Sequence, residues 1–103
     1  LKTGRVRGVW RDLATTGDEW AKAVALERLW PHLPAELQTQ AEAVAGAFRD
    51  PWVRADLIAF LSTRVPPAQG RRLLEQAIAS ARSAPSPWAS ARALTAVLSR
   101  TEG

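Results

Sequence analysis

Three tryptophans at nearly regular spacing constrain the fold of this 103-residue chain more than any other feature. Trp20, Trp52 and Trp88 lie 32 and then 36 residues apart, and when they are aligned, apolar residues coincide six and nine positions after each of them. Those positions hold Leu26, Ile58 and Leu94, followed by Leu29, Leu61 and Val97. A period of about 20–50 residues is typical of stacked structural repeats, so the sequence predicts three similar units.

The residues before the tryptophans predict that each tryptophan opens a helix. Asp50-Pro51 and Ser86-Pro87 are an N-cap residue followed by proline, which suits the first helical position because its missing N–H needs no partner. In the first unit Asp18 is the predicted N-cap, and Glu19 replaces proline with a charge that suits the positive end of the helix dipole. Apolar periodicity and proline punctuation then predict six helices, near residues 5–15, 18–31, 35–48, 51–64, 67–83 and 87–100.

The four-residue difference between the two spacings corresponds to about one helical turn. We assign it to the helix after Pro34, which we expect to be one turn shorter than the helix after Pro66. The predicted fold is therefore all-α, a short right-handed α-solenoid of about three helical hairpins. The hairpins span about 5–33, 34–65 and 66–100 of a single domain, 1–103.

Residues 29–34 (Leu-Trp-Pro-His-Leu-Pro), the alanine-rich helix that follows them, and residues 50–55 (Asp-Pro-Trp-Val-Arg-Ala) resemble a known kind of repeat. They are similar to the degenerate tetratricopeptide- and HEAT-like helical hairpins of bacterial proteins that are attached to NACHT-type signalling ATPases. The resemblance covers roughly residues 9–100 and implies a sensor or protein-binding role. The tetratricopeptide pattern places its tryptophan in the first helix of a hairpin, whereas here tryptophan opens the second.

The five tryptophans divide into two groups by their place in the period. Trp20, Trp52 and Trp88 recur at equivalent positions, so we interpret them as packing anchors between neighbouring hairpins. Trp10 and Trp30 break the period, which favours exposure at a binding patch or a role in capping the stack. We therefore name Trp10 and Trp30 as binding candidates.

The formal charge of +4 lies entirely in the second half of the chain. Residues 1–51 carry seven basic and seven acidic residues, and residues 52–103 carry seven basic and three acidic ones. Arg71 and Arg72, which lie together on one predicted helix, are therefore further candidates for a binding surface. One alternative function is a basic helical-repeat module that binds a nucleic-acid backbone, although no Gly-rich phosphate loop or recognition-helix motif accompanies the charge.

The favoured function is a non-enzymatic protein- or peptide-binding scaffold or sensor, part of a larger bacterial protein. The alanine- and arginine-rich composition suggests the bacterial source. The single histidine, His32, has no partner for a metal site or catalytic triad, and there is no cysteine. We expect no catalytic residue, cofactor, metal or membrane partner, and a cytoplasmic location. A death-fold-like six-helix signalling adaptor and a designed repeat protein are further alternatives.

Overall fold

The computed structural model describes residues 3–15 and 17–102, and within them the chain is entirely helical. The prediction of six helices without strands is confirmed for these residues. Positions 1–2, 16 and 103 of the predicted single domain lie outside the described part. The elements are α1 (Thr3–Ala14), α2 (Glu19–Leu29), the 3-10 turn η1 (Trp30–His32), α3 (Ala35–Gly46), α4 (Pro51–Ser62), α5 (Pro67–Arg82) and α6 (Pro87–Thr101).

The three predicted N-caps are confirmed. The carboxylate of Asp18 accepts a hydrogen bond from the Ala21 N–H at 3.2 Å. The carboxylate of Asp50 accepts from two N–H groups of the first turn of α4, at 2.9 and 3.4 Å. The hydroxyl of Ser86 accepts from the Ala89 N–H at 3.1 Å. Each cap satisfies backbone donors that a helix start leaves free, so these side chains fix where the helix begins.

The lengths of α3 and α5 account for the uneven spacing of the tryptophans. α3 has 12 residues and α5 has 16, so the difference is the four residues expected from the sequence. The missing turn does not disturb the buried face of α3, where Leu37, Ala41 and Ala45 are spaced four apart.

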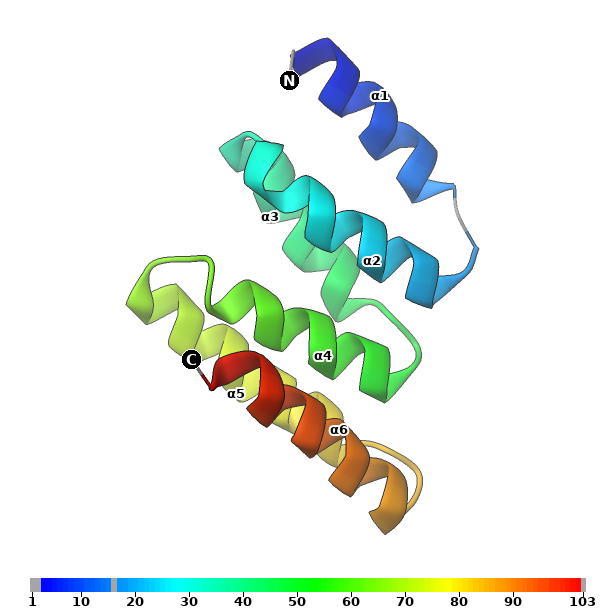
Figure 1. Cartoon of the computed structure of the whole chain (residues 1–103), viewed down its shortest axis with the longest axis vertical. Helices are drawn as coiled ribbons and strands as arrows, with labels where there is room; N and C mark the ends of the chain where they lie inside the picture. Colours follow the sequence, from blue (N-terminus) through cyan, green and yellow to red (C-terminus); the bar gives the residue numbers. More distant parts are fainter. Residues whose placement is uncertain (1–2, 16, 103) are drawn as a thin grey trace.

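The helices are arranged around α4. Figure 1 shows α2, α4 and α6 side by side, with α3 and α5 behind them and α1 at the end of the molecule that carries the N-terminus. α4 contacts α2, α3, α5 and α6, and seven of its 12 residues are buried. The molecule measures 43 × 31 × 19 Å. The core therefore runs along the length of the molecule and is densest at its middle helix.

A carboxylate of α2 ties the first helix pair to the start of α4. Glu19 accepts hydrogen bonds from the backbone N–H groups of Arg49 and Asp50, at 2.7 and 2.9 Å. Desolvation opposes the charged form, but these two hydrogen bonds and the positive charges of Arg49 and Lys22 outweigh it. Together they hold the pKa of Glu19 below its ordinary value of 4.5.

We expect Glu19→Gln to lower the free energy of unfolding at neutral pH by about 1–2 kcal/mol, because hydrogen bonds to a charged acceptor are stronger than those to an amide. A carboxyl whose pKa is depressed by folding contributes its stability above its unfolded pKa and loses it as the pH falls through the folded pKa. The difference between wild type and variant should therefore shrink below about pH 4.5. Urea unfolding across this range measures it. Glu75→Gln, at an exposed position, is the control, and an equal effect of both variants would contradict the prediction.

Candidate functional site

The candidate site lies on the layer formed by α2, α4 and α6. Side chains four residues apart share one side of a helix, and the tryptophan at the start of each of these helices begins such a stripe. The stripes read Trp20, Val24 and Arg28 on α2; Trp52, Asp56, Phe60 and, just past the helix end, Arg64 on α4; and Trp88, Arg92, Ala96 and Arg100 on α6. Three features of different chemistry occur along them.

The first feature is a ladder of aromatic rings and a guanidinium, Trp20, Trp52, Arg92 and Trp88, which we call the tryptophan ladder. The rings of Trp20 and Trp52 are stacked with centroids 5.2 Å apart and planes inclined by 14°. The Arg92 guanidinium lies 4.5 Å from the centroid of Trp52 and 5.5 Å from that of Trp88. Cations over indole faces are attracted by the ring quadrupole, so the ladder is continuous across all three helices.

The exposure of the ladder differs from the sequence expectation. Trp20 and Trp52 do contact each other across neighbouring helices, but Trp20 is 47% exposed and Trp88 is 71% exposed. Trp20 thus packs against the tryptophan of the next unit, as the sequence predicts, while both Trp20 and Trp88 keep much of their surface exposed. Exposed large aromatics are favoured at binding surfaces, so the regular tryptophans become the better functional candidates.

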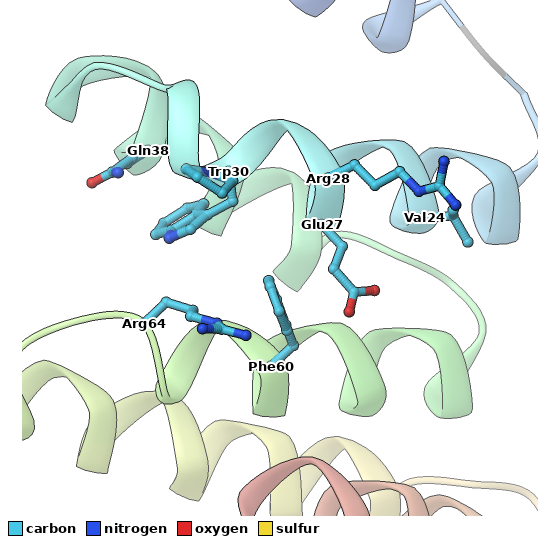
Figure 2. A pocket seen from close by; sticks show the side chains of 8 residues that line it. Val24, Glu27, Arg28, Trp30, Gln38, Phe60 and Arg64 are labelled. Atoms are coloured by element: carbon cyan, nitrogen blue, oxygen red, sulfur yellow. The ribbon is translucent and has the colours of Figure 1, made fainter.

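The second feature is an open groove between α2 and α4, with a volume of about 740 Å³, which we call the α2–α4 groove. It is lined by Val24, Glu27, Arg28, Trp30, Pro31, Gln38, Phe60 and Arg64. Figure 2 shows Phe60 of α4 and Arg64, just past the end of α4, facing Trp30 and Glu27 across the groove. The Arg64 guanidinium lies 4.8 Å from the centre of the Phe60 ring. The groove thus combines apolar walls with two arginines, Arg28 and Arg64, that have no ion pair among the described residues.

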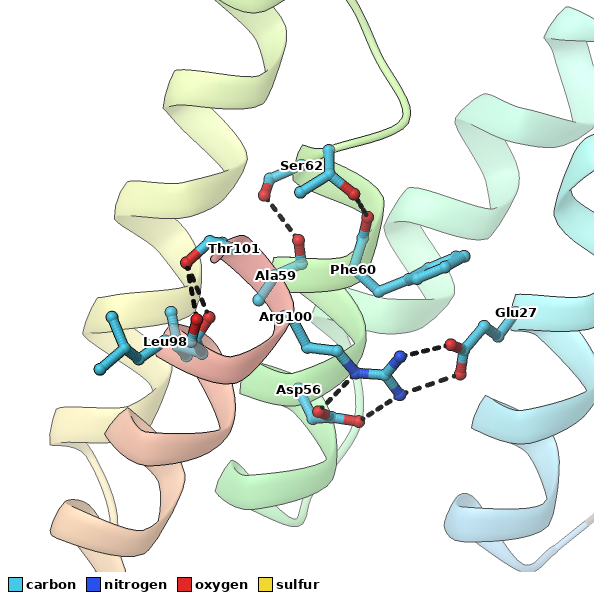
Figure 3. Close-up of polar contacts among 10 residues, drawn as sticks. Glu27, Asp56, Ala59, Phe60, Ser62, Leu98, Arg100 and Thr101 are labelled. Carbon is cyan, nitrogen blue, oxygen red and sulfur yellow. Dashed lines mark hydrogen bonds and ion pairs between the residues drawn. The ribbon is translucent and has the colours of Figure 1, made fainter. Parts of the chain in front are cut away.

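The third feature is a charge cluster that spans three helices. Figure 3 shows Arg100 of α6 reaching between Asp56 on α4 and Glu27 on α2. Its guanidinium donates two hydrogen bonds to each carboxylate, at 2.5–3.1 Å. The hydrogen bond with Asp56 is the main cause that raises the pKa of Arg100, desolvation opposes it, and Glu27 adds to the rise. Arg100 offsets only one of the two negative charges of Glu27 and Asp56. Arg28 and Arg64 add two positive charges beside the cluster, so the groove and the cluster taken together are net positive.

A smaller hollow adjoins the ladder at the start of α4. It has a volume of about 440 Å³ and is formed by the α4 N-terminus together with the loop between α5 and α6. Its lining residues are Arg49, Asp50, Pro51, Trp52, Ala84, Pro85 and Ala89. Because the lining is mostly apolar and shares Trp52 with the ladder, the hollow extends the aromatic surface rather than forming a separate polar site.

The four residues that the sequence singled out do not form one surface. Trp10 is half-buried on α1, and its Nε1 donates to Gln40 on α3 at 3.2 Å. Trp30 is only 4% exposed, so its expected exposure is wrong, and it forms a wall of the α2–α4 groove instead. Arg71 and Arg72 are exposed on α5, at the opposite end of the molecule from α1 (Figure 1).

The sequence analysis missed the ladder, the groove and the charge cluster. Spacing by four could have placed Arg92 one turn after Trp88, and Phe60 two turns after Trp52, on the same helix side as the tryptophan. No comparable signal exists for the charge cluster. Glu27, Asp56 and Arg100 fall at three different offsets after their tryptophans, so aligning the units does not bring them together.

Among the described residues there is no group of histidines and acids that could hold a metal ion. Within the same part of the chain, no helix is long and apolar enough to cross a membrane. The site consists of aromatic rings, a charge cluster and a groove with both apolar and charged walls, on an all-helical frame. The chain matches no protein-family model, and neither the curated proteins nor the solved structures contain a match to it.

Proposed function

We propose that this chain is a non-enzymatic module that binds a protein or peptide segment on the α2–α4–α6 layer, as the sensor or scaffold part of a larger bacterial protein. We also propose that its three helix pairs form a short right-handed α-solenoid, which would present this layer as an extended surface. The observation that carries the binding proposal is the α2–α4 groove, which lies on the same helix sides as the exposed tryptophan ladder.

The chemistry of the groove favours an extended, acidic segment with an apolar or aromatic side chain. Phe60 and Trp30 provide the apolar walls, while Arg28 and Arg64 provide positive charge and form no ion pair with the described residues. An acidic side chain of the ligand would reach these guanidiniums, and arginine suits carboxylate because its N–H groups match the two oxygens. The exposed indole of Trp20 then offers a contact for residues beyond the groove.

Selection of random peptides displayed on phage against the immobilised chain tests this proposal. We expect enriched peptides to combine acidic with aromatic or apolar residues. Isothermal titration of one synthetic peptide should then show that Arg28→Glu and Arg64→Glu weaken binding by at least about tenfold, because charge reversal places like charges together. Circular dichroism confirms that each variant is folded.

Arg71→Glu and Arg72→Glu on α5 are the matched controls, since they make the same charge change on exposed arginines outside the groove. They should leave peptide affinity within about twofold of wild type at moderate salt, where distant surface charges are screened. Equal losses from α5 and groove variants would contradict the groove as the binding site. A selection that yields no peptide, together with salt-sensitive binding of random-sequence DNA that the α5 variants abolish, would favour the nucleic-acid alternative.

A further inference from the structure

The two ends of the molecule expose apolar residues at positions that are buried further inside. The alignment of the three tryptophans makes this comparison possible, because it gives each residue of α6 counterparts at the same distance from the tryptophan in the first two units. A side chain that is buried in two units and exposed in the third shows which face of the third unit has no covering neighbour.

The C-terminal end shows this for one side of α6. Its side chains Ala91, Leu94, Thr95 and Leu98 are all exposed, with Leu98 at 55%. The counterparts in α4 are Ala55, Ile58, Ala59 and Ser62, of which the first three are fully buried and the last is half-buried. In the first unit the counterparts Ala23 and Leu26 of α2 and Trp30 of η1 are buried, and Glu27 of α2 is half-buried. In α2 and α4 this side of the helix is covered by neighbouring parts of the chain, whereas in α6 it is exposed. We call it the α6 end face.

The N-terminal end shows the complementary pattern. Ala21 and Ala25 are exposed on α2, whereas their counterparts Val53 and Leu57 in α4 are buried. In α6 the counterpart of Ala25 is Ala93, which is fully buried.

The first helix repeats this pattern. Val9 on α1 is 45% exposed, while its counterparts Ala41 and Ala77 in α3 and α5 are fully buried. We call the surface that carries Val9, Ala21 and Ala25 the α1–α2 end face.

We propose that a second copy of this chain docks head to tail, with its α1–α2 end face on the α6 end face of the first copy. Inside the chain, each helix pair packs against the next through surfaces equivalent to these two faces. The α6 end face corresponds to the surface that contacts the following pair, and the α1–α2 end face to the surface that contacts the preceding pair. Among residues 3–15 and 17–102, no helix covers either face. The second copy therefore continues the internal packing, and no partner of different chemistry is required to cover either face.

The tryptophan ladder supports the same register. Trp20 stacks on Trp52 of the next pair, while Trp88 at the C-terminal end is 71% exposed and has only Arg92 beside it in the ladder. In this register, Trp20 of the second copy would lie next to Trp88 of the first copy. The two rings would then be related in the same way as Trp52 and Trp20 are within one chain. A head-to-tail contact of this kind is heterologous and does not close on itself, so association is expected to continue beyond dimers as concentration rises.

Sedimentation velocity of the wild-type chain between about 1 µM and about 1 mM tests the proposal, a range that covers interfaces of modest affinity. We expect the weight-average sedimentation coefficient to rise with concentration past that of a dimer. Leu98→Glu blocks the α6 end face and Ala25→Glu blocks the α1–α2 end face. Each variant alone should remain monomeric, because it has one working face only, and the unaltered faces of two identical molecules cannot pair.

An equimolar mixture of the two variants is the decisive sample. It should form a one-to-one dimer and nothing larger, because the intact α6 end face of one variant meets the intact α1–α2 end face of the other. Ala79→Glu on α5 is the control, since its counterparts Arg11 and Ala43 are exposed as well, and it should associate like wild type. Circular dichroism checks that all three variants are folded.

A wild-type chain that stays monomeric over the whole range would overturn the proposal. So would a mixture that contains only monomers. If Leu98→Glu abolished association while Ala25→Glu left it unchanged, two α6 end faces would be pairing symmetrically, which also contradicts the head-to-tail contact. These variants lie outside the residues that line the α2–α4 groove, so the result does not depend on whether the chain binds peptides there.

Discussion

Gly70→Ala is expected to destabilise the chain by about 1–3 kcal/mol, the usual cost of overpacking a tight contact. Gly70 is buried in the first turns of α5, where that helix passes the end of α4. A Cβ atom added there would lie 2.4 Å from the backbone carbonyl oxygen of Ser62, and a backbone atom cannot move aside as a side-chain end can. The two helices would have to separate. For a domain of this size the loss corresponds to a fall in melting temperature of roughly 4–20 °C.

Two other helical glycines make the matched comparison. A Cβ at Gly46 in α3 would meet only the amide nitrogen of Gln76 at 3.0 Å, which is the far end of a flexible side chain. At Gly8 in α1 nothing lies within 4 Å. Alanine is a better helix former than glycine by up to about 1 kcal/mol, so both substitutions should be neutral or stabilising. Thermal unfolding of all three variants measures the contrast. If the Gly70→Ala variant were as stable as the Gly8→Ala variant, the close contact between α5 and the Ser62 carbonyl oxygen would be contradicted.

Arg100→Met is expected to lower the free energy of unfolding by about 2–3 kcal/mol, somewhat less than for a fully buried ion pair. Methionine keeps the length of the side chain but removes the charge that lies between Glu27 and Asp56. The two carboxylates, both largely shielded from solvent, would then face each other without a counter-ion. Repulsion between these two charges in a partly desolvated site is the physical cause of the expected loss. Urea unfolding at neutral pH measures it.

Two further variants separate the charge cluster from general effects of removing an arginine. Arg71→Met removes an exposed arginine that has no hydrogen bond or ion pair with the described residues, so it should change stability by less than about 0.5 kcal/mol. Glu27→Gln combined with Arg100→Met should restore part of the loss, because one of the two facing charges is gone. If the double variant were no more stable than Arg100→Met, the carboxylate repulsion would not be the cause.

The three features of the α2–α4–α6 layer are coupled through the middle helix. Phe60 of α4 lies beneath the guanidiniums of both Arg64 and Arg100, at 4.8 and 5.6 Å from the ring centre. Arg100 therefore holds the third helix pair to the first and also covers one wall of the α2–α4 groove. A ligand acid that competes with Glu27 or Asp56 for this guanidinium would act on the contact between the pairs, which links binding to the packing of the molecule.

The positions of the helices could be predicted from the sequence because they depend on local chemistry. Asp18, Asp50 and Ser86 accept from the N–H groups of their own helix starts, and this geometry needs no distant partner. The shorter α3 followed from spacing alone, since four residues make about one turn and preserve the buried side. Position within the aligned units was not enough to predict burial, because Leu26 and Ile58 are buried whereas Leu94 at the same position is exposed.

Whether each tryptophan is buried or exposed was decided only by the tertiary structure. Trp20 and Trp88 fit the period yet are exposed, and Trp30 breaks the period yet is buried. Repetition shows that residues are equivalent, but burial depends on which neighbouring helix covers that side and on whether the unit lies at an end. The charge cluster has the same origin. Arg100, Asp56 and Glu27 are up to 73 residues apart, and they meet because helix packing places α6, α4 and α2 side by side, which no local pattern encodes.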